Sequence, residues 1–424
     1  MTVAGTPGWW PVIAAAEVGT QPVRVDAGGI PYVVFRPGPG EPVSVVAARC
    51  PHRLVRLDHG SVVGGRLRCA YHGWEFDIGG ACELVPSGGP DAAAPPRAHL
   101  ATPWGLHEED GTVWVAPVEP GSAVVDDDHR ADRETFTNLD ASLRAAWHPV
   151  ALAGELDPGY LTVRLLGEDW TLRRAGEGIA ADPAPAGLCE RFGVIWLAPE
   201  PPRTELFDAA DDADPAFAGA WLIPARSESC AGVLADNFLD VAHFPFVHAG
   251  TFGSAEDPYV PPIQVVPAAD GFSTVQEQWF DNPEDPGVIA GVRPVRQRRR
   301  ATYVYRAPFQ LLLRLEELDA GAIKTILFFL QPEDLRSTRI YTKMLLHGIG
   351  GVPVPGPDVV ANEVAFEVAV LAEDLALQRA MTVTGLPLRM RDELHVRADR
   401  SGVALRRILR RFAGLDDPRD APEG

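Results

Sequence analysis

Two short cysteine–histidine pairs near the start of the chain carry the side chains best suited to chemistry. Cys50 and His52 form a Cys-x-His pair, and Cys69 and His72 form a Cys-x-x-His pair after a further sixteen residues. Together they offer two thiolates and two imidazoles, a set that could hold a tetrahedral zinc ion. The tight Cys-x-His spacing favours instead a two-iron cluster, with the thiolates on one iron and the imidazoles on the other. Such a cluster relays single electrons.

A second group of candidate ligands lies near the middle of the chain. Asp240, His243 and His248 occur within nine residues. The spacing of Asp240 and His243 would place both on one face of a helix, which Pro245 would end or kink before His248. A mononuclear iron with open positions for dioxygen and substrate needs two imidazoles and one carboxylate. This segment supplies the imidazoles, so the carboxylate ligand must come from elsewhere.

The first two pairs resemble the cluster-binding loops of the Rieske family. The resemblance covers residues 49–53, with the sequence RCPHR, and residues 64–76, with the sequence GGRLRCAYHGWEF. It implies that both cysteine–histidine pairs hold a [2Fe-2S] cluster, whose imidazole ligands raise its reduction potential. Aromatic side chains beside the second pair are expected to shield the cluster: Tyr71, Trp74 and Phe76.

Residues 236–248, with the sequence DNFLDVAHFPFVH, resemble the iron motif of the Rieske non-haem iron oxygenases. Those enzymes take a third iron ligand from an aspartate on a late helix, and residues 373–378, with the sequence EDLALQ, match that element. The resemblance therefore implies that His243, His248 and Asp374 hold a mononuclear Fe(II).

The same resemblance assigns Asp240 a connecting role. In the family, the equivalent carboxylate hydrogen-bonds an iron-ligand histidine and a cluster-ligand histidine of a neighbouring subunit. Asp240 would therefore join His243 to His72, fixing the imidazole tautomers and coupling the two metal sites. Asn237 would lie beside the iron. Asp236 stands where the family commonly has a glutamate, and we assign it no role.

Three further features are interpreted as structural or left open. Glu367 and Glu373 share a predicted helix with Asp374 and are competing carboxylates. Residues 392–399, with the sequence DELHVRAD, resemble the ending of the vanillate demethylase and phenoxybenzoate branch and are interpreted as packing. The remaining cysteines form no paired framework and are expected to be free thiols: Cys82, Cys189 and Cys230.

The elements that must position these ligands divide the chain into segments. Short strands between Gly, Pro and Asp turns predict an all-β Rieske domain at residues 1–118. Residues 119–144 are acidic and typical of a linker, and residues 201–215 form a second connection. Residues 216–412 mix strands and helices, and the resemblance implies a catalytic domain with an antiparallel sheet flanked by helices. A tail follows at residues 413–424, and the fold class is α+β.

Hydrophobic periodicity locates individual elements within these segments. Apolar residues recur at helical spacing from residue 358 to residue 381, and a closing helix is predicted at residues 397–412. Residues 323–330 form an almost continuous apolar run, as expected for a buried strand. Further strands are predicted at residues 43–48, 67–69, 112–116, 302–305 and 311–315.

Residues 145–200 repeat part of the Rieske domain. Residues 147–150, WHPV, echo residues 9–12, WWPV, at an offset of 138. Residues 190–199 echo residues 109–117 at an offset of 82, so the second copy is shorter by 138 minus 82, or 56 residues. The missing part would carry the cluster loops. We interpret this segment as a degenerate, truncated Rieske-like β domain without a cluster.

Composition sets outer limits on location and partners. The 424 residues have room for two or three domains, with 46% apolar and 23% charged residues, as in ordinary globular proteins. The apolar runs are too short to cross a membrane, and the start lacks a signal peptide's basic residues, so we expect a cytoplasmic location and no membrane partner. The net charge of −20 disfavours nucleic-acid binding.

The resemblance implies an oxygenase component that uses dioxygen to hydroxylate, demethylate or otherwise oxidise a small aromatic or natural-product substrate. Electrons from NAD(P)H would come through a separate ferredoxin or flavin reductase, because no Gly-x-Gly-x-x-Gly fingerprint is present. The branch resemblance favours monooxygenation or demethylation over cis-dihydroxylation. Two alternatives stay open: a Rieske electron-transfer protein with a vestigial iron site, and a zinc-stabilised binding module.

The repeat raises a question about assembly. In relatives, the cluster serves the iron of the next subunit in a homotrimer. We hypothesise that the N-terminal domain here docks on its own catalytic domain, where a neighbour's Rieske domain would otherwise sit. His72 would then meet Asp240 within one monomer.

Overall fold

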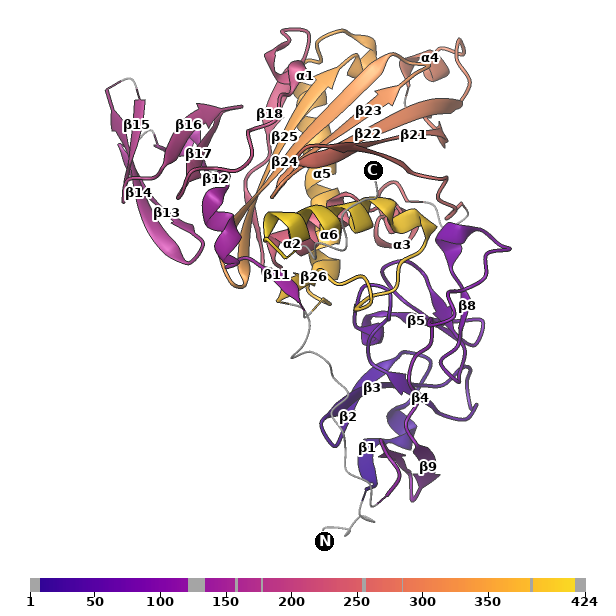
Figure 1. Ribbon diagram of the computed structural model, residues 1–424. Helices are drawn as coiled ribbons and strands as arrows, with labels where there is room; N and C mark the ends of the chain where they lie inside the picture. Colours follow the sequence, from indigo (N-terminus) through magenta and orange to yellow (C-terminus); the bar gives the residue numbers. More distant parts are fainter. Residues whose placement is uncertain are drawn as a thin grey trace, which may run out of the picture.

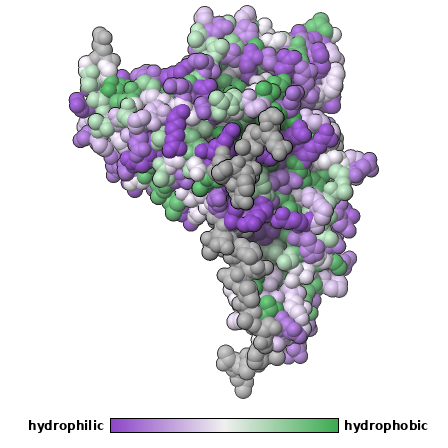
Figure 2. Space-filling view, in the orientation of Figure 1, coloured by the Kyte–Doolittle hydropathy of each residue, from purple (hydrophilic) through white to green (hydrophobic). Residues whose placement is uncertain are grey.

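Three units make up the molecule (Figure 1). The computed structural model describes residues 8–120, 134–156, 159–176, 178–253, 257–283, 285–381 and 384–415. An N-terminal β module lies at one end, a short β module at the other, and a C-terminal domain with a large sheet between them. The α+β fold class is confirmed. Hydrophilic residues are spread over all three units on the face shown in Figure 2.

The N-terminal module (residues 8–118) holds three small antiparallel sheets. The first has the order β1 (Trp10–Ala14), β10 (Thr112–Ala116) and β9 (Gly105–Glu109). The second has β2 (Val23–Ala27), β3 (Ile30–Phe35) and β4 (Ser44–Ala47). The third has β5 (Ser61–Val63), β6 (Arg66–Arg68), β7 (Glu75–Phe76) and β8 (Cys82–Leu84). The predicted strands of this module are thus present, each within a residue or two.

The short module (residues 145–200) has two three-stranded antiparallel sheets. One has the order β12 (His148–Leu152), β17 (Val194–Ala198) and β16 (Gly187–Arg191). The other has β13 (Tyr160–Leu165), β14 (Glu168–Ala175) and β15 (Gly178–Asp182). Alternating apolar residues from both sheets enclose a separate core around Trp170.

An eight-stranded antiparallel sheet forms the centre of the C-terminal domain. Its order is β18 (Ala218–Trp221), β25 (Ser337–His347), β24 (Ala322–Asp334), β23 (Gln310–Glu317), β22 (Arg296–Arg306), β21 (Gly271–Asp281) and β20 (Gln264–Ala268), and β19 (Ala225–Ser227) also pairs with β25. The three predicted strands lie within β22, β23 and β24. β24 and β25 are the most deeply buried, because both faces of the sheet are covered there.

Helices cover one face of this sheet (Figure 1). They are α2 (Ala231–Phe238), α3 (Phe244–Val247), α5 (Pro357–Gln378) and α6 (Arg400–Phe412), while α1 (Ala210–Ala213) and α4 (Pro286–Ile289) are single turns elsewhere. The short module covers the other face, where Trp196 packs with Leu327 and Phe329. The prediction of a sheet flanked by helices therefore holds for one face only.

Two local predictions are wrong. The linker does not extend to residue 144, because β11 (Thr135–Thr137) pairs with β26 (Gly385–Pro387) and Phe136 is fully buried. Asp240 and His243 do not share a helix: α2 ends at Phe238, and Pro245 sits in the first turn of α3 instead of ending a helix. Proline is tolerated in a first turn because its missing N–H has no intrahelical partner there. Residues 121–133 and 416–424 of the predicted linker and tail lie outside the described residues.

Candidate metal centres and their connection

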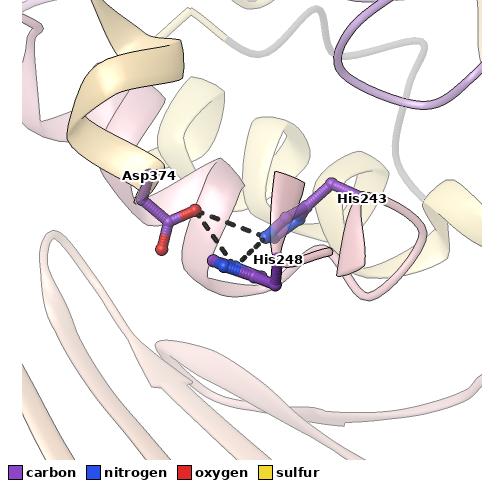
Figure 3. A group of neighbouring side chains, drawn as sticks. All are labelled: His243, His248 and Asp374. Atoms are coloured by element: carbon purple, nitrogen blue, oxygen red, sulfur yellow. Dashed lines mark hydrogen bonds and ion pairs between the residues drawn. The ribbon is translucent and has the colours of Figure 1, made fainter. Parts of the chain in front are cut away.

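Three candidate iron ligands converge beneath the sheet (Figure 3). The Nε2 atoms of His243 and His248 are 3.1 Å apart, and Asp374 Oδ1 lies 3.4 Å from each. Atoms with these separations share a point about 2 Å from all three, which is a normal metal–nitrogen or metal–oxygen bond length. Two imidazoles and a carboxylate on one triangular face are the donor set that non-haem iron takes. The arrangement therefore fits the metal that the sequence predicts.

Two helices position these ligands. His243 directly precedes α3 and His248 directly follows it, so one short turn aims both imidazoles at the same point. Asp374 comes from the last turns of α5. The histidines are almost fully buried, at 2% and 1% exposure, and burial raises the pKa of Asp374, but hydrogen bonds from both histidines outweigh this and hold that pKa well below its usual range. The carboxylate is therefore ionised and ready to bind a cation.

The competing carboxylates on α5 have other contacts. Glu373 accepts a hydrogen bond from His248 Nδ1 at 2.9 Å and another from Thr251 Oγ1 at 2.9 Å. This contact fixes the tautomer that leaves Nε2 free for a metal. Glu367 lies seven residues before Asp374 on α5, about two helical turns away, and lines a cavity. Of the three acidic residues, only Asp374 joins both imidazoles.

Asn237 lies beside the three candidate iron ligands and contacts one of them. Its Nδ2 donates to Asp374 Oδ1 at 3.2 Å, and its Oδ1 accepts from Gln378 Nε2 at 3.0 Å. Asn237 therefore helps to orient the Asp374 oxygen that faces the histidines. Its role is positional in this geometry, because its amide already has both partners.

The four candidate cluster ligands meet at the tips of two loops of the N-terminal module. All are buried, with exposures of 1–2%. The Nδ1 atoms of His52 and His72 are 3.1 Å apart. A hydrogen bond from Cys50 lowers the pKa of Cys69 to about 7, while burial raises that of Cys50. The two sulfurs thus face each other beside two imidazole nitrogens, which fits a cluster held by both pairs.

Aromatic residues enclose this site. Trp74 is fully buried, and its ring stacks on His52 at 4.6 Å with an interplanar angle of 9°. Its Nε1 is buried and has no hydrogen-bond partner among the described residues. The ring of Tyr71 lies 3.9 Å from that of His72 and 5.7 Å from that of His243, between the two candidate metal sites.

Asp240 connects the two sites from one side only. Its Oδ2 lies 2.5 Å from His72 Nε2, and its Oδ1 accepts a hydrogen bond from the Ala242 backbone. Burial raises the pKa of Asp240, but the attraction and hydrogen bond of His72 outweigh it and hold that pKa well below its usual range. The predicted second link is not formed here: His243 Nδ1 is buried and has no hydrogen-bond partner in the described structure.

Asp399 is a functional candidate that the sequence analysis missed. Both of its oxygens lie 3.0 Å from Nε2 of His52, so each cluster-loop histidine meets one carboxylate of the C-terminal domain. Burial lowers the pKa of His52 to about 4, although the attraction of Asp399 acts to raise that pKa. Residues 392–399 therefore do more than pack. The only sequence signal for Asp399 was the resemblance of residues 392–399 to the ending of the vanillate demethylase and phenoxybenzoate branch.

A buried ion-pair network supports Asp399. Arg53 contacts Asp399 at 3.1 Å and Asp236 at 3.4 Å. Arg406, which has no exposed surface, contacts Asp236 and Glu393 at 2.7 Å each. Asp236, to which we assigned no role, thus joins the two domains. Removing one member of such a network leaves an uncompensated buried charge, which is strongly destabilising.

A narrow cavity of about 40 Å³ lies beside the candidate iron site. Its walls come from α2, α5, β24 and β25. The lining residues are Leu234, Asn237, Phe238, Phe328, Thr342, Glu367, Leu371 and Asp374. Four of the lining residues are apolar and four are polar or charged, and the volume is enough for a few water molecules.

Comparison with known families agrees with this geometry. Residues 8–100 match the Rieske [2Fe-2S] domain. Residues 227–414 match the Vanillate O-demethylase oxygenase C-terminal domain. The chain belongs to the Rieske oxygenases. The predicted family is therefore confirmed.

Individual Rieske oxygenases and related proteins match to different extents. Methylxanthine N1-demethylase NdmA of Pseudomonas putida is 24% identical over 88% of this chain and 77% of its own. Dicamba O-demethylase of Stenotrophomonas maltophilia is 33% identical over 36% of this chain and 41% of its own. Protein TIC 55 of Pisum sativum is 27% identical over 39% of this chain, which spans only 31% of that relative. A solved structure of NdmA with caffeine matches 96% of this chain and 90% of its own, at 20% identity and a TM-score of 0.40. Among the described helices, none is long and apolar enough to cross a membrane.

Proposed function

We propose that this chain is the oxygenase component of a Rieske system that oxidises a small organic molecule with dioxygen. Cys50, His52, Cys69 and His72 would hold the [2Fe-2S] cluster, and His243, His248 and Asp374 would hold a mononuclear Fe(II). The observation that carries the proposal is the 2.5 Å contact between His72 and Asp240. It brings a ligand of one candidate centre to the carboxylate that lies three residues before His243, a ligand of the other.

When bound, the cluster would supply single electrons and the mononuclear iron would activate dioxygen. The protein's own residues do the rest. Asp240 holds the Nε2 proton of His72, which leaves Nδ1 of that ring for the cluster. Glu373 holds the Nδ1 proton of His248 in the same way, which leaves Nε2 of that ring for the iron. Burial of both histidine pairs excludes water from the path between the two centres.

The substrate class is proposed from the cavity and the family branch. The aromatic rings of Phe238 and Phe328 line the cavity beside Asp374, and we propose an aromatic or natural-product substrate with monooxygenation or demethylation as the outcome. Methylxanthine and dicamba demethylases among the relatives support this choice. Electrons would come from a separate ferredoxin or flavin reductase, and we propose a cytoplasmic location.

A single-turnover experiment tests the proposed activity. The protein is reduced chemically, exposed to dioxygen with a panel of aromatic substrates, and analysed for product by mass spectrometry. We expect about three irons per chain, two in the cluster and one mononuclear. Asp374→Ala should retain the cluster spectrum, lose the third iron and form no product, whereas Asp358→Ala at the exposed start of the same helix should behave as the parent.

The alternatives predict different results. Product formed by Asp374→Ala would contradict the oxygenase proposal. A cluster that cycles with a reductase but never yields product would support an electron-transfer protein with a vestigial iron site. A colourless preparation that contains zinc and no labile sulfide would support a zinc-stabilised binding module.

We also propose that electrons pass within one chain and that the working unit is a monomer. The N-terminal module touches its own C-terminal domain through His72, His52 and Arg53. The short module, as a degenerate Rieske-like copy, covers a different face of the sheet. A chain that holds its own N-terminal module against its own C-terminal domain therefore needs no cluster from a neighbouring chain.

Mixing two defective chains tests this arrangement. Cys69→Ser removes the cluster, and Asp374→Ala removes the iron. If electrons passed between chains, the mixture would regain activity, since each chain would supply what the other lacks. We expect no recovery, and a mass near the 45.7 kDa of one chain by light scattering. Recovered activity in a trimeric mixture would refute the single-chain arrangement.

A further inference from the structure

The surface around α6 carries arginines whose charges no acidic neighbour offsets. Figure 1 shows α6 at the front of the molecule, between the sheet and the N-terminal module. Five exposed arginines of residues 385–415 make no ion pair within the described structure: Arg391, Arg397, Arg400, Arg407 and Arg411. The acidic side chains of the same segment are only 1–10% exposed and already have arginine partners: Asp392, Glu393 and Asp399. The exposed charge of this segment is therefore positive.

Three of these arginines share one face of α6. Arg400, Arg407 and Arg411 are spaced by seven and four residues, which places them on the same side of the helix. The other side of α6 packs into the main core through Leu405, Leu409 and Phe412. The core therefore fixes the helix and holds the three arginines in a row about 16 Å long.

The positive charge continues across the boundary between the two domains. Arg97 of the N-terminal module is exposed, and its Nη2 donates to the backbone oxygen of Arg391 at 2.9 Å. Arg400 Nη1 donates to the backbone oxygen of Ile263 at 3.0 Å. Carbonyl oxygens hold these two guanidinium groups in place without neutralising them. We call Arg97 and the five arginines named above the arginine surface.

The arginine surface lies next to the candidate cluster. Asp399 directly precedes Arg400, and both of its oxygens lie 3.0 Å from Nε2 of His52. Arg397 is exposed two residues before Asp399. A single buried carboxylate thus separates the surface from a candidate cluster ligand. An electron donor bound on the arginine surface would therefore be close to the cluster.

The charge of the whole chain determines which donor fits this surface. The net charge is −20, so an acidic protein is repelled by the chain as a whole and attracted where the exposed charge is positive. Such a contrast orients an acidic partner as it approaches and raises its rate of association. A basic partner would be repelled at the arginine surface and attracted elsewhere.

We infer that the arginine surface is the docking site of an acidic one-electron carrier of the ferredoxin type. Carboxylates around the carrier's own [2Fe-2S] group contact the arginines, and one electron passes from the reduced carrier to the oxidised cluster of this chain. The carrier is oxidised and the cluster is reduced, with no bond made or broken. The transfer is favourable because histidine ligands raise a cluster's potential above that of an all-cysteine ferredoxin. The inference rests on the proposed function for the presence of the cluster.

Rapid mixing of the metal-loaded full chain with a reduced plant-type ferredoxin tests the docking. The absorbance of the cluster gives its rate of reduction. Arg397→Glu and Arg407→Glu together should slow this reduction about tenfold or more, because two attractive charges become repulsive. Neither side chain makes a hydrogen bond or ion pair within the described residues, so the double variant should keep its fold and its cluster. Arg397→Gln with Arg407→Gln should give an intermediate rate.

A second double variant has the same net charge and separates local attraction from general repulsion. Arg24→Glu and Arg173→Glu reverse exposed arginines on the N-terminal and short modules. At about 0.1 M salt, where charges more than about 10 Å apart are screened, this control should slow the reduction less than about twofold. The parent rate should fall steeply as salt is added. Photoreduced deazaflavin, a small reductant that needs no docking site, should reduce the parent and both variants alike.

The outcomes separate the docking from the proposed function. A parent without a cluster spectrum would contradict the proposed function and the inference with it. A loaded parent that both double variants match, or whose rate is independent of salt, would overturn the inference alone. In that case, binding to phosphatidylserine vesicles that only Arg397→Glu with Arg407→Glu loses would assign the surface to a membrane. Hydrogen-exchange protection of α6 that is lost on removing residues 416–424 would assign it to this chain's own acidic segment.

Discussion

The two β modules repeat the same strand pairing at opposite ends of the molecule. β1 pairs with β10 through a register that shifts between Pro11 and Ile13, and β12 pairs with β17 through the same shift between Pro149 and Ala151. The apolar cores of the two modules are built from equivalent residues, which lie 138 positions apart in the first part of each module and 82 positions apart in the last part. The matched buried pairs are Val25 and Val163, Tyr32 and Trp170, Val34 and Leu172, Val113 and Ile195, and Val115 and Leu197.

The modules differ in what lies between these shared strands. The N-terminal module inserts residues 48–104, which carry both candidate cluster loops and a second core around Trp74. The inserted part makes the contacts with the C-terminal domain, through His72 and Arg53. The short module lacks this insertion and packs on the sheet with its β17 strand, through Trp196.

The strand frame and the chemistry are therefore carried by separate parts of the N-terminal module. The short module encloses a complete apolar core without any cysteine–histidine loop. A frame of this kind is therefore stable without a metal. The inserted loops determine where the module docks and what it delivers, so changes in the loops should affect electron delivery while changes in the shared frame should affect stability alone.

The largest effect is expected at the carboxylate that joins the domains. Asp240→Asn keeps the size of the side chain but cannot balance the charge at His72. We expect both metals to stay bound and product formation to fall about 10–100-fold, as for other residues that support metal ligands. Rapid-mixing absorbance of the reduced cluster, followed with product analysis, measures the change. Asp169→Asn on the exposed surface of the short module is the matched control, and an unchanged rate in Asp240→Asn would contradict the connecting role.

A somewhat smaller effect is expected where the cluster loop meets α3. Gly73 has a φ of +66°, and a Cβ atom there would lie 2.2 Å from the ring of Phe246. Gly73→Ala should therefore push the loop away from α3 and slow cluster-to-iron electron transfer about tenfold or more. The double variant Gly73→Ala, Phe246→Ala removes the clash and should recover part of the rate. No recovery would mean that backbone strain, rather than docking, limits the single variant.

The candidate ligands could be named from the sequence because local motifs carry most of them. The two cysteine–histidine pairs lie on short loops, and residues 243–248 form one turn, so their convergence depends on few long-range contacts. Asp374 is different: its position came from the family resemblance, and α5 could have presented Glu367 or Glu373 instead. The structure brings Asp374 to the histidines through the helix face it shares with Leu371 and Gln378.

Partners far apart in the sequence were not predictable. His52 and Asp399 are 347 residues apart, and no local pattern marks Asp399 as a partner of an imidazole. The same holds for the Arg406 pair with Asp236, 170 residues away. The error at Pro245 has another cause, since proline is compatible with both the end of one helix and the first turn of the next.

Acid should destabilise the strand frame of the short module by about 2 kcal/mol at pH 5, through a buried histidine that the equivalent frame position of the N-terminal module lacks. His148 of the short module is fully buried and donates from Nε2 to Leu143 O at 2.8 Å, whereas the equivalent position of the N-terminal module is Trp10. Burial lowers the pKa of His148 from 6.5 to about 4. Below pH 6.5 the unfolded chain therefore binds a proton at His148 that the folded module does not bind. The stability that is present above pH 6.5 is lost as the pH falls towards 4. At pH 5 the loss is about 2 kcal/mol.

Hydrogen exchange of each module, normalised to the unfolded chain at the same pH, measures this loss. The short module should lose protection between pH 7 and pH 5, and His148→Gln should flatten its pH dependence. Equal pH dependence in the parent and in His148→Gln would show that another group causes the acid sensitivity.

The smallest effect is expected at a glycine that both frames share. A Cβ on Gly105 would lie 2.5 Å from the ring of Trp9, and a Cβ on Gly187 would lie 2.5 Å from the ring of Trp147. Neither tryptophan is fully buried, so each ring can shift. Gly105→Ala and Gly187→Ala should each destabilise their own module by about 1 kcal/mol, at the low end for overpacking. Hydrogen exchange should show the two losses to be equal within error, with product formation unchanged in both variants, because neither glycine touches the loops that deliver electrons. A loss confined to Gly105→Ala would mean that the short module has kept the strand order of the frame but not its packing.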